Sequence, residues 1–143
     1  MLQITNSQMA TIRSHAQESY PQECCGILIG EESGEVRRVV SVNTCRNDET
    51  VSSANRYKIH PKDLIAAQKL ARQQGFDIIG FYHSHPDHPP RWSGTDLKEA
   101  HWMGSSYLIV SVSAKGTSDA ASYLLRGANE EEKHFEEEEL HLL

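Results

Sequence analysis

The sequence predicts an α+β fold, in which a mixed and curved β-sheet is flanked by helices. Two observations predict it. Apolar runs and amphipathic segments follow one another in the order helix, strand, strand, helix, strand, helix, strand, strand. That order is typical of a mixed sheet with helices packed on it. In addition, no repeat or long linker interrupts the 143 residues, so we expect residues 1–143 to form one domain.

Composition and charge exclude several classes of protein. The formal net charge of −6 argues against nonspecific nucleic-acid binding, which needs a basic face. No apolar run approaches the ~20 residues that span a bilayer. The first residues also lack the basic start and apolar block of a secretory signal. We therefore expect a cytoplasmic protein with neither a nucleic-acid nor a membrane partner.

The three cysteines are Cys24, Cys25 and Cys45. An odd number without a secretory signal argues against a disulfide framework. Small buried apolar side chains are therefore the first interpretation of all three.

The first segments predict a helix followed by a hairpin. Residues 5–23 favour a helix that Thr5 or Asn6 caps and that Pro21 ends. The apolar run of residues 24–30 predicts a strand, and residues 36–43 predict a second strand after a turn that contains a glycine. These two strands are expected to pair.

The middle of the chain predicts a loop, a short strand, a helix and a central strand. Residues 44–56 are polar and rich in turn-forming residues, and residues 57–60 can form a short strand. Pro61 then begins a helix that ends at Gly75. Residues 76–85 are apolar enough for a strand in the centre of the sheet.

The last third predicts a helix and two strands before a glutamate-rich tail. Residues 93–104 predict a helix with Ser93 as its N-cap, and residues 106–113 and 121–127 predict a strand hairpin. The acidic tail, residues 129–143, is either an edge strand or a frayed end. We favour an edge strand, for which Phe135, Leu140 and Leu142 supply the apolar contacts.

A group of candidate metal ligands follows the central strand. His83 and His85 are two residues apart, so on an extended chain they project to the same side. Asp96 falls in the first turn of the next helix, where the helix dipole favours a carboxylate. Two histidines and one carboxylate are typical of catalytic zinc, with a fourth position left for water. For the two histidines alone, a hydrogen-bonded pair at a strand end is an equally good interpretation.

The spacing of these residues resembles the JAMM metallopeptidase motif of the MPN domain family. That motif is H-x-H, seven residues, S, two residues, D, and it is matched by His83, His85, Ser93 and Asp96. The family also has a glutamate just ahead of an apolar strand, and Glu23 occupies that place. The chain lacks room for the insertions of the large eukaryotic members, so it is similar to the small prokaryotic type. The fold that this resemblance implies is layered like that of the cytidine deaminases.

The resemblance implies a function and a role for each residue. It implies a Zn²⁺ metallopeptidase in which His83, His85 and Asp96 bind the metal. Glu23 is implied to move protons between water and the leaving amine, and Ser93 to stabilise the oxyanion. The implied substrate is the C-terminal Gly-Gly tail of a ubiquitin-like or sulfur-carrier protein, joined by a peptide or isopeptide bond.

Two other functions are considered beside this one. Some MPN domains have lost their ligands and serve as noncatalytic protein-binding scaffolds. Zinc deaminases carry H-x-E followed by P-C-x-x-C, and this chain has neither. Within the site, His88 is an alternative ligand, a cysteine at position 24 or 25 is a competing one, and His101 is a candidate for supporting a ligand from behind.

Overall fold

The computed structural model describes all residues from Met1 to Leu143, which form three helices and eight strands. The helices are α1 (Asn6–Ser19), α2 (Pro61–Gln73) and α3 (Gly94–Glu99). The strands are β1 (Leu2–Ile4), β2 (Cys25–Ser33), β3 (Val36–Cys45), β4 (Asp77–Pro86), β5 (Ser106–Ser113), β6 (Gly116–Arg126), β7 (His134–Glu138) and β8 (Leu140–Leu142).

All eight strands form one mixed sheet in the order β7-β6-β5-β4-β2-β3-β1-β8. The predicted hairpins, β2–β3 and β5–β6, are antiparallel pairs, and β4 is paired with β2 and β5 near the centre of the sheet. The chain reaches β5 from β4 through α3, which makes that pair parallel. The α+β class and the mixed sheet that the sequence predicts are confirmed.

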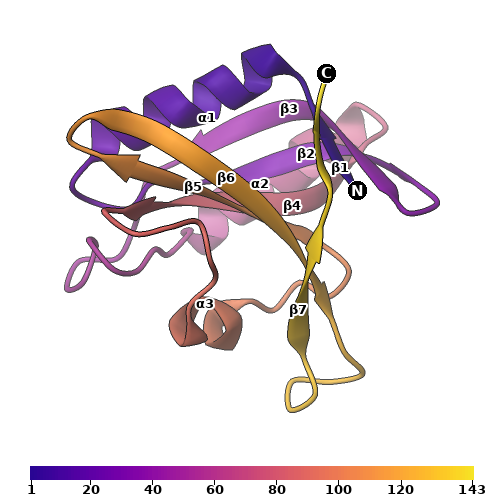
Figure 1. Cartoon of the computed structure of the whole chain (residues 1–143). Helices are drawn as coiled ribbons and strands as arrows, with labels where there is room; N and C mark the ends of the chain where they lie inside the picture. Colours follow the sequence, from indigo (N-terminus) through magenta and orange to yellow (C-terminus); the bar gives the residue numbers. More distant parts are fainter.

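The acidic tail closes the sheet on itself. β7 and β8 lie at opposite edges in the strand order, yet only Glu139 separates them in the chain. The sheet therefore has to curl until its two edges meet, and Figure 1 shows this segment in yellow running from β6 to β1. The edge strand favoured from the sequence is confirmed, and the tail is held at both edges rather than frayed.

A buried polar cluster lies where the tail meets the rest of the sheet. Glu138 accepts from the Arg37 guanidinium at 2.7 Å and from the Ser122 hydroxyl at 2.8 Å. Arg37, only 4% exposed, also donates to the Ser106 hydroxyl at 2.8 Å. Removing one partner of a buried ion pair costs about 3–5 kcal/mol, because the other charge stays buried. The closing segment is therefore fixed to β3, β5 and β6 by charge as well as by strand pairing.

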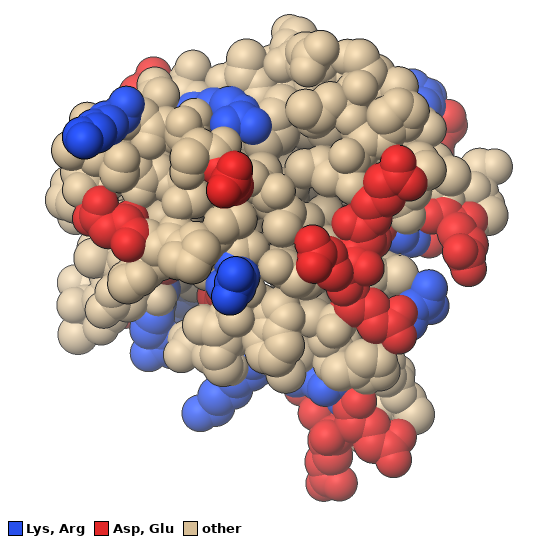
Figure 2. Space-filling model, viewed as in Figure 1, with Lys and Arg blue, Asp and Glu red and all other residues tan.

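The glutamates that made the tail ambiguous in the sequence face water. Six of them are exposed, and Figure 2 shows acidic side chains gathered in the region of β7 and the loop before it. The tail also has an apolar contact, because Phe135 packs against Tyr107 and Tyr123 with ring centroids 5.4 and 6.0 Å apart. A strand at an edge tolerates many charges, which also discourage pairing with another chain. The exposed glutamates are Glu130, Glu131, Glu132, Glu136, Glu137 and Glu139.

One helix covers each face of the sheet (Figure 1). On one face, Met9, Ile12 and Ala16 of α1 pack in a cluster with strand residues such as Tyr82. On the other face, α2 supplies residues to a second cluster around Phe81. The two faces follow from the alternation of side chains along β4. None of the three helices combines the length and the apolar character that a membrane-spanning helix needs.

Two predicted elements are wrong in type or extent. Residues 57–60 form no strand, because they have no neighbouring strand to pair with and His60 instead caps α2 by accepting from the Lys62 amide. The helix predicted for residues 93–104 ends at Glu99. Ala100 has an extended backbone, and Trp102 packs against Phe81 in an edge-on contact. The strand β1 was not predicted at all.

Candidate metal centre

The three predicted ligands come together in the structure. His83 Nε2 lies 3.3 Å from one carboxylate oxygen of Asp96, and His85 Nε2 lies 3.0 Å from the other. The two Nε2 atoms are 3.2 Å apart. All three side chains are buried, and their ligand atoms lie within 4.8 Å of one another. Two rings and one carboxylate therefore face a common point.

Strand pairing and a helix cap hold this geometry. His83 and His85 end the central strand β4, where β5 pairs with both and β2 pairs with His83. His85 Nδ1 faces the Pro89 carbonyl oxygen at 2.9 Å, which orients its ring and leaves Nε2 for the centre. Asp96 belongs to a capping box, because its carboxylate accepts from the Ser93 amide while its own amide donates to the Ser93 hydroxyl.

Burial and mutual contact shift the protonation of the three groups. Burial lowers the pKa of His83 and outweighs the opposing effect of Asp96. Burial also lowers the pKa of His85, but hydrogen bonds with Asp96 and the Pro89 carbonyl raise it above its ordinary value. Burial raises the pKa of Asp96, but the two histidines hold it well below its ordinary range. The carboxylate is therefore ionised at neutral pH.

The chemistry of this donor set fits a metal ion. Metal ligands must be a neutral imidazole or an ionised carboxylate, and His83 and Asp96 are biased toward those forms. Nitrogen and oxygen ligands of this number leave one position of a tetrahedral zinc site open. The second interpretation of the histidines, a pair bonded only to each other, does not account for a buried carboxylate beside both.

Glu23 lies beside this group with an unusual environment. Its side chain is 4% exposed, and its Oε1 atom has no hydrogen-bond partner. Burial raises the pKa of Glu23 to about 8, with a lowering effect from His85 and a further raising effect from Asp96. A partnerless buried carboxyl group near a ligand cluster is typical of a functional position rather than of a surface acid.

This pKa gives a stability prediction for the metal-free protein. Between about pH 4.5 and 8, folded Glu23 keeps a proton that the unfolded chain releases, so the free energy of unfolding falls as pH rises. Glu23→Gln removes that loss. We expect the variant to gain on the order of a few kcal/mol over the wild type between pH 4.5 and pH 8. Urea unfolding of both metal-free proteins at the two pH values measures it, and an equal difference at both would contradict it.

Ser93 keeps a proton to donate. Its hydroxyl oxygen accepts from the Asp96 amide at 3.0 Å, and the side chain is exposed at the beginning of α3. A hydroxyl that accepts a hydrogen bond still carries its own O–H donor. The cap therefore fixes the position of Ser93 next to the predicted ligand Asp96 and leaves its O–H donor free.

Two residues that the sequence did not single out support the centre. The Tyr57 ring stacks on the His83 ring with centroids 4.4 Å apart and planes 21° apart. The buried Ser84, between the two histidines, accepts from the Cys24 amide through its hydroxyl at 2.8 Å. In the sequence, Tyr57 is marked only as the aromatic residue that follows a polar loop, and it falls in the short strand predicted for residues 57–60.

The alternative ligands lie outside the group. His88 is exposed, and its backbone carbonyl accepts from the Ser111 hydroxyl. Cys24 packs in the core beneath α1, while the Cys25 thiol faces the Arg46 carbonyl oxygen at 3.8 Å. His101 lies on the surface, where it pairs with Glu130 at 3.0 Å. None of these side chains belongs to the cluster of ligand atoms.

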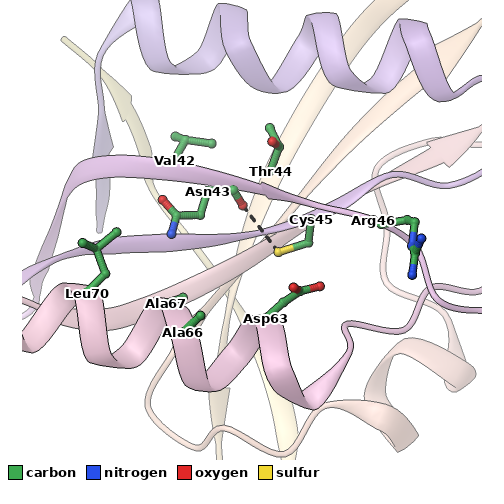
Figure 3. Close-up of a pocket in the computed structure, with 9 residues that line it drawn as sticks. All are labelled: Val42, Asn43, Thr44, Cys45, Arg46, Asp63, Ala66, Ala67 and Leu70. Atoms are coloured by element: carbon green, nitrogen blue, oxygen red, sulfur yellow. Dashed lines mark hydrogen bonds between the residues drawn. The ribbon is translucent and has the colours of Figure 1, made fainter.

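Two surface cavities flank α2. The larger, about 670 Å³, lies between β3 and α2, and its lining residues include Cys45, Asp63 and Leu70 (Figure 3). No member of the metal group lines it. The other, about 480 Å³, is lined by residues of the loop between β3 and α2, among them Tyr57, and by Glu99 and Trp102. No member of the metal group lines this second cavity either, but Tyr57, which does line it, stacks on His83 and so links the cavity to the centre.

Comparison with known proteins agrees with this architecture. The chain is 34% identical over 114 residues to a desampylase of Haloferax volcanii. The aligned residues cover 76% of this chain and 78% of that protein. It is 29% identical over 125 residues to a probable TtuB-protein conjugate cleaving protease of Thermus thermophilus, covering 87% and 76% of the two chains.

A solved structure shares the whole fold. The solution structure of protein DSY2949 from Desulfitobacterium hafniense matches with a TM-score of 0.85 and 30% identity, over 100% of this chain and 93% of that one. The sequence pattern of the prokaryotic homologs of the JAB domain matches residues 5–125. The resemblance to the small prokaryotic JAMM and MPN proteins is thereby confirmed, and the chain belongs to the family of prokaryotic JAB-domain homologs.

Proposed function

We propose that this protein is a zinc-dependent metallopeptidase that cleaves a peptide or isopeptide bond at the C-terminal Gly-Gly tail of a ubiquitin-like or sulfur-carrier protein. One observation carries the proposal. A buried cluster of His83, His85 and Asp96 lies beside a buried glutamate that has a partnerless oxygen and a raised pKa. A bound metal would supply an activated water, and the glutamate would be the group that takes its proton.

Each residue has a role that its environment supports. Zinc held by His83, His85 and Asp96 would act as a Lewis acid and lower the pKa of a water molecule to about 7. Glu23 would accept the proton that the attacking water loses and deliver it to the leaving amine. The Ser93 hydroxyl donates to the carbonyl oxygen as negative charge develops there.

The substrate class is supported by the site's surroundings and by its relatives. The cavity beside Tyr57 is open at the surface, and its lining includes the aromatic residues Phe81 and Tyr107. A flexible tail can lie extended in such a groove, and glycines fit where larger side chains would not pass. The similarity to a desampylase and to a probable conjugate-cleaving protease favours a protein conjugate as the substrate.

The direct test uses zinc-loaded protein and carriers with a Gly-Gly tail, each supplied as a conjugate to a second protein or to an amine. We expect intact mass spectrometry to show release of the free carrier, with its terminal glycine restored to a carboxylate. The same conjugates with the last glycine replaced by valine are the control and should stay intact. Tight binding of the conjugates without any hydrolysis would contradict the proposal and favour a noncatalytic scaffold.

A further inference from the structure

Glu23 lies just before β2, where the strand ladder does not reach it. Its backbone is held instead by the loop of residues 46–60. The Glu23 amide donates to the Ser53 carbonyl oxygen at 2.7 Å, and the Glu23 carbonyl accepts from the Asn47 side chain at 3.1 Å. Both backbone hydrogen bonds of Glu23 therefore go to one loop, and one of them is made by a side-chain amide.

Asn47 uses all of its hydrogen-bonding capacity. Besides Glu23, its Nδ2 group donates to the Arg56 carbonyl at 3.0 Å. Its Oδ1 atom accepts from the Glu49 amide at 2.9 Å and from the Lys58 amide at 3.0 Å. A carboxamide has two N–H donors and two acceptor lone pairs, so the side chain is saturated. Asn47 thus joins the first part of the loop, residues 46–49, to its last part, residues 56–58, and joins both to Glu23. These two parts are the arms of the loop.

The two arms of this loop connect the parts of the centre. Tyr57, which stacks on the metal-group residue His83, lies between two residues whose backbones Asn47 binds. Cys24, the residue that follows Glu23, exchanges two hydrogen bonds with Ser84, which lies between the two histidines. Glu23 is thereby located relative to β4 through Ser84 and relative to the loop through Asn47.

We propose that Asn47 is a positioning residue for Glu23, setting the distance between its carboxyl group and the metal group through the Glu23 backbone. The inference rests on the proposed role of Glu23. Proton transfer requires atoms within hydrogen-bond reach, and a misplacement of about 1 Å can cost on the order of 100-fold in rate. Asn47 touches neither the metal group nor the attacking water, so it acts only through Glu23 and the loop.

Asn47→Asp is the decisive variant. It keeps the size and an acceptor oxygen, but it replaces the NH2 group, which donates to two carbonyls, with an oxygen that repels them. We expect kcat on the zinc-loaded protein to fall about 10–100-fold, with KM and zinc content changed less than about twofold. Asn43→Asp makes the same chemical change on β3. The side-chain amide of Asn43 donates no hydrogen bond, so this variant should leave kcat unaltered.

A second readout does not depend on activity. Amide hydrogen exchange at Glu23, whose N–H group is bonded to the Ser53 carbonyl of the same loop, should be faster in Asn47→Asp than in Asn43→Asp. The proposal requires both the lower kcat and the faster exchange, and absence of either overturns it. If Asn47→Asp does not fold, Asn47→Ser, which keeps one short donor, takes the same measurements with the same criteria.

The outcomes separate this inference from the proposed function. If the wild type cleaves and Glu23→Gln does not, a normal kcat in Asn47→Asp overturns the positioning role alone. If Glu23→Gln cleaves as well as the wild type, the role of Glu23 is wrong and the inference that rests on it falls with it. If Asn47→Asp loses zinc and stability and also has a raised KM, its role is a general structural one, and the inference is likewise overturned.

Discussion

Glu23→Gln should abolish cleavage and leave zinc bound. The substitution keeps the size of the side chain and removes the group that we propose accepts and returns the proton. General acid–base catalysis contributes about 10²–10⁴-fold, so we expect kcat to fall by that factor. The metal group does not include Glu23, so the zinc content should stay at one ion per chain. Single-turnover cleavage of a carrier conjugate, with elemental analysis of the same sample, measures both.

The matched control for this prediction is Glu35→Gln. Glu35 is exposed in the turn between β2 and β3, so the same chemical change there should alter neither rate nor zinc. If Glu23→Gln cleaves with the kcat of the wild type, Glu23 does not transfer the proton. A variant that loses its zinc would instead mean that Glu23 binds the metal directly.

His83→Ala and Asp96→Ala should each lose zinc. Each variant removes one of three ligand atoms that face a common point, and even residues that only support a ligand change affinity by about 10–100-fold. We expect a larger loss for a ligand itself, on the order of 100-fold or more in zinc affinity. Competition with a chelator of known affinity measures it, and cleavage should disappear at limiting zinc.

One control variant and one comparison separate loss of a ligand from loss of structure. His88→Ala alters an exposed histidine three residues beyond His85 and should bind zinc like the wild type. Asp96 also belongs to the cap of α3, so its loss can loosen the helix, whereas His83 belongs to no cap and its loss leaves the capping box in place. Equal zinc occupancy in His83→Ala and the wild type would count decisively against the ligand assignment.

The ligand cluster could be predicted from the sequence because its parts obey local rules. His83 and His85 share a side of one strand, and Asp96 follows Ser93 at the spacing of a capping box. These short-range relations place the two rings on one side of β4 and the carboxylate in the first turn of α3. Only the meeting of β4 with α3 required the fold, and the short connection between them leaves few ways for them to lie apart.

The supporting residues could not be predicted because they depend on contacts between distant segments. Tyr57 reaches His83 from a polar loop without regular structure, and no periodicity reports where such a loop lies. Arg37 lies in a predicted strand, but its burial follows only from the approach of Glu138 from far along the chain. The strand β1 is too short to show alternation at all.

The closure of the sheet has a consequence for synthesis and proteolysis. Until residues 134–142 leave the ribosome, both β6 and β1 present open backbone edges, which are templates for pairing with other chains. Dissociation of this segment after a proteolytic cut near Gly127 would expose the same two edges. Aggregation of nascent or nicked protein should therefore start at the edges of β6 and β1 rather than near His83 and His85.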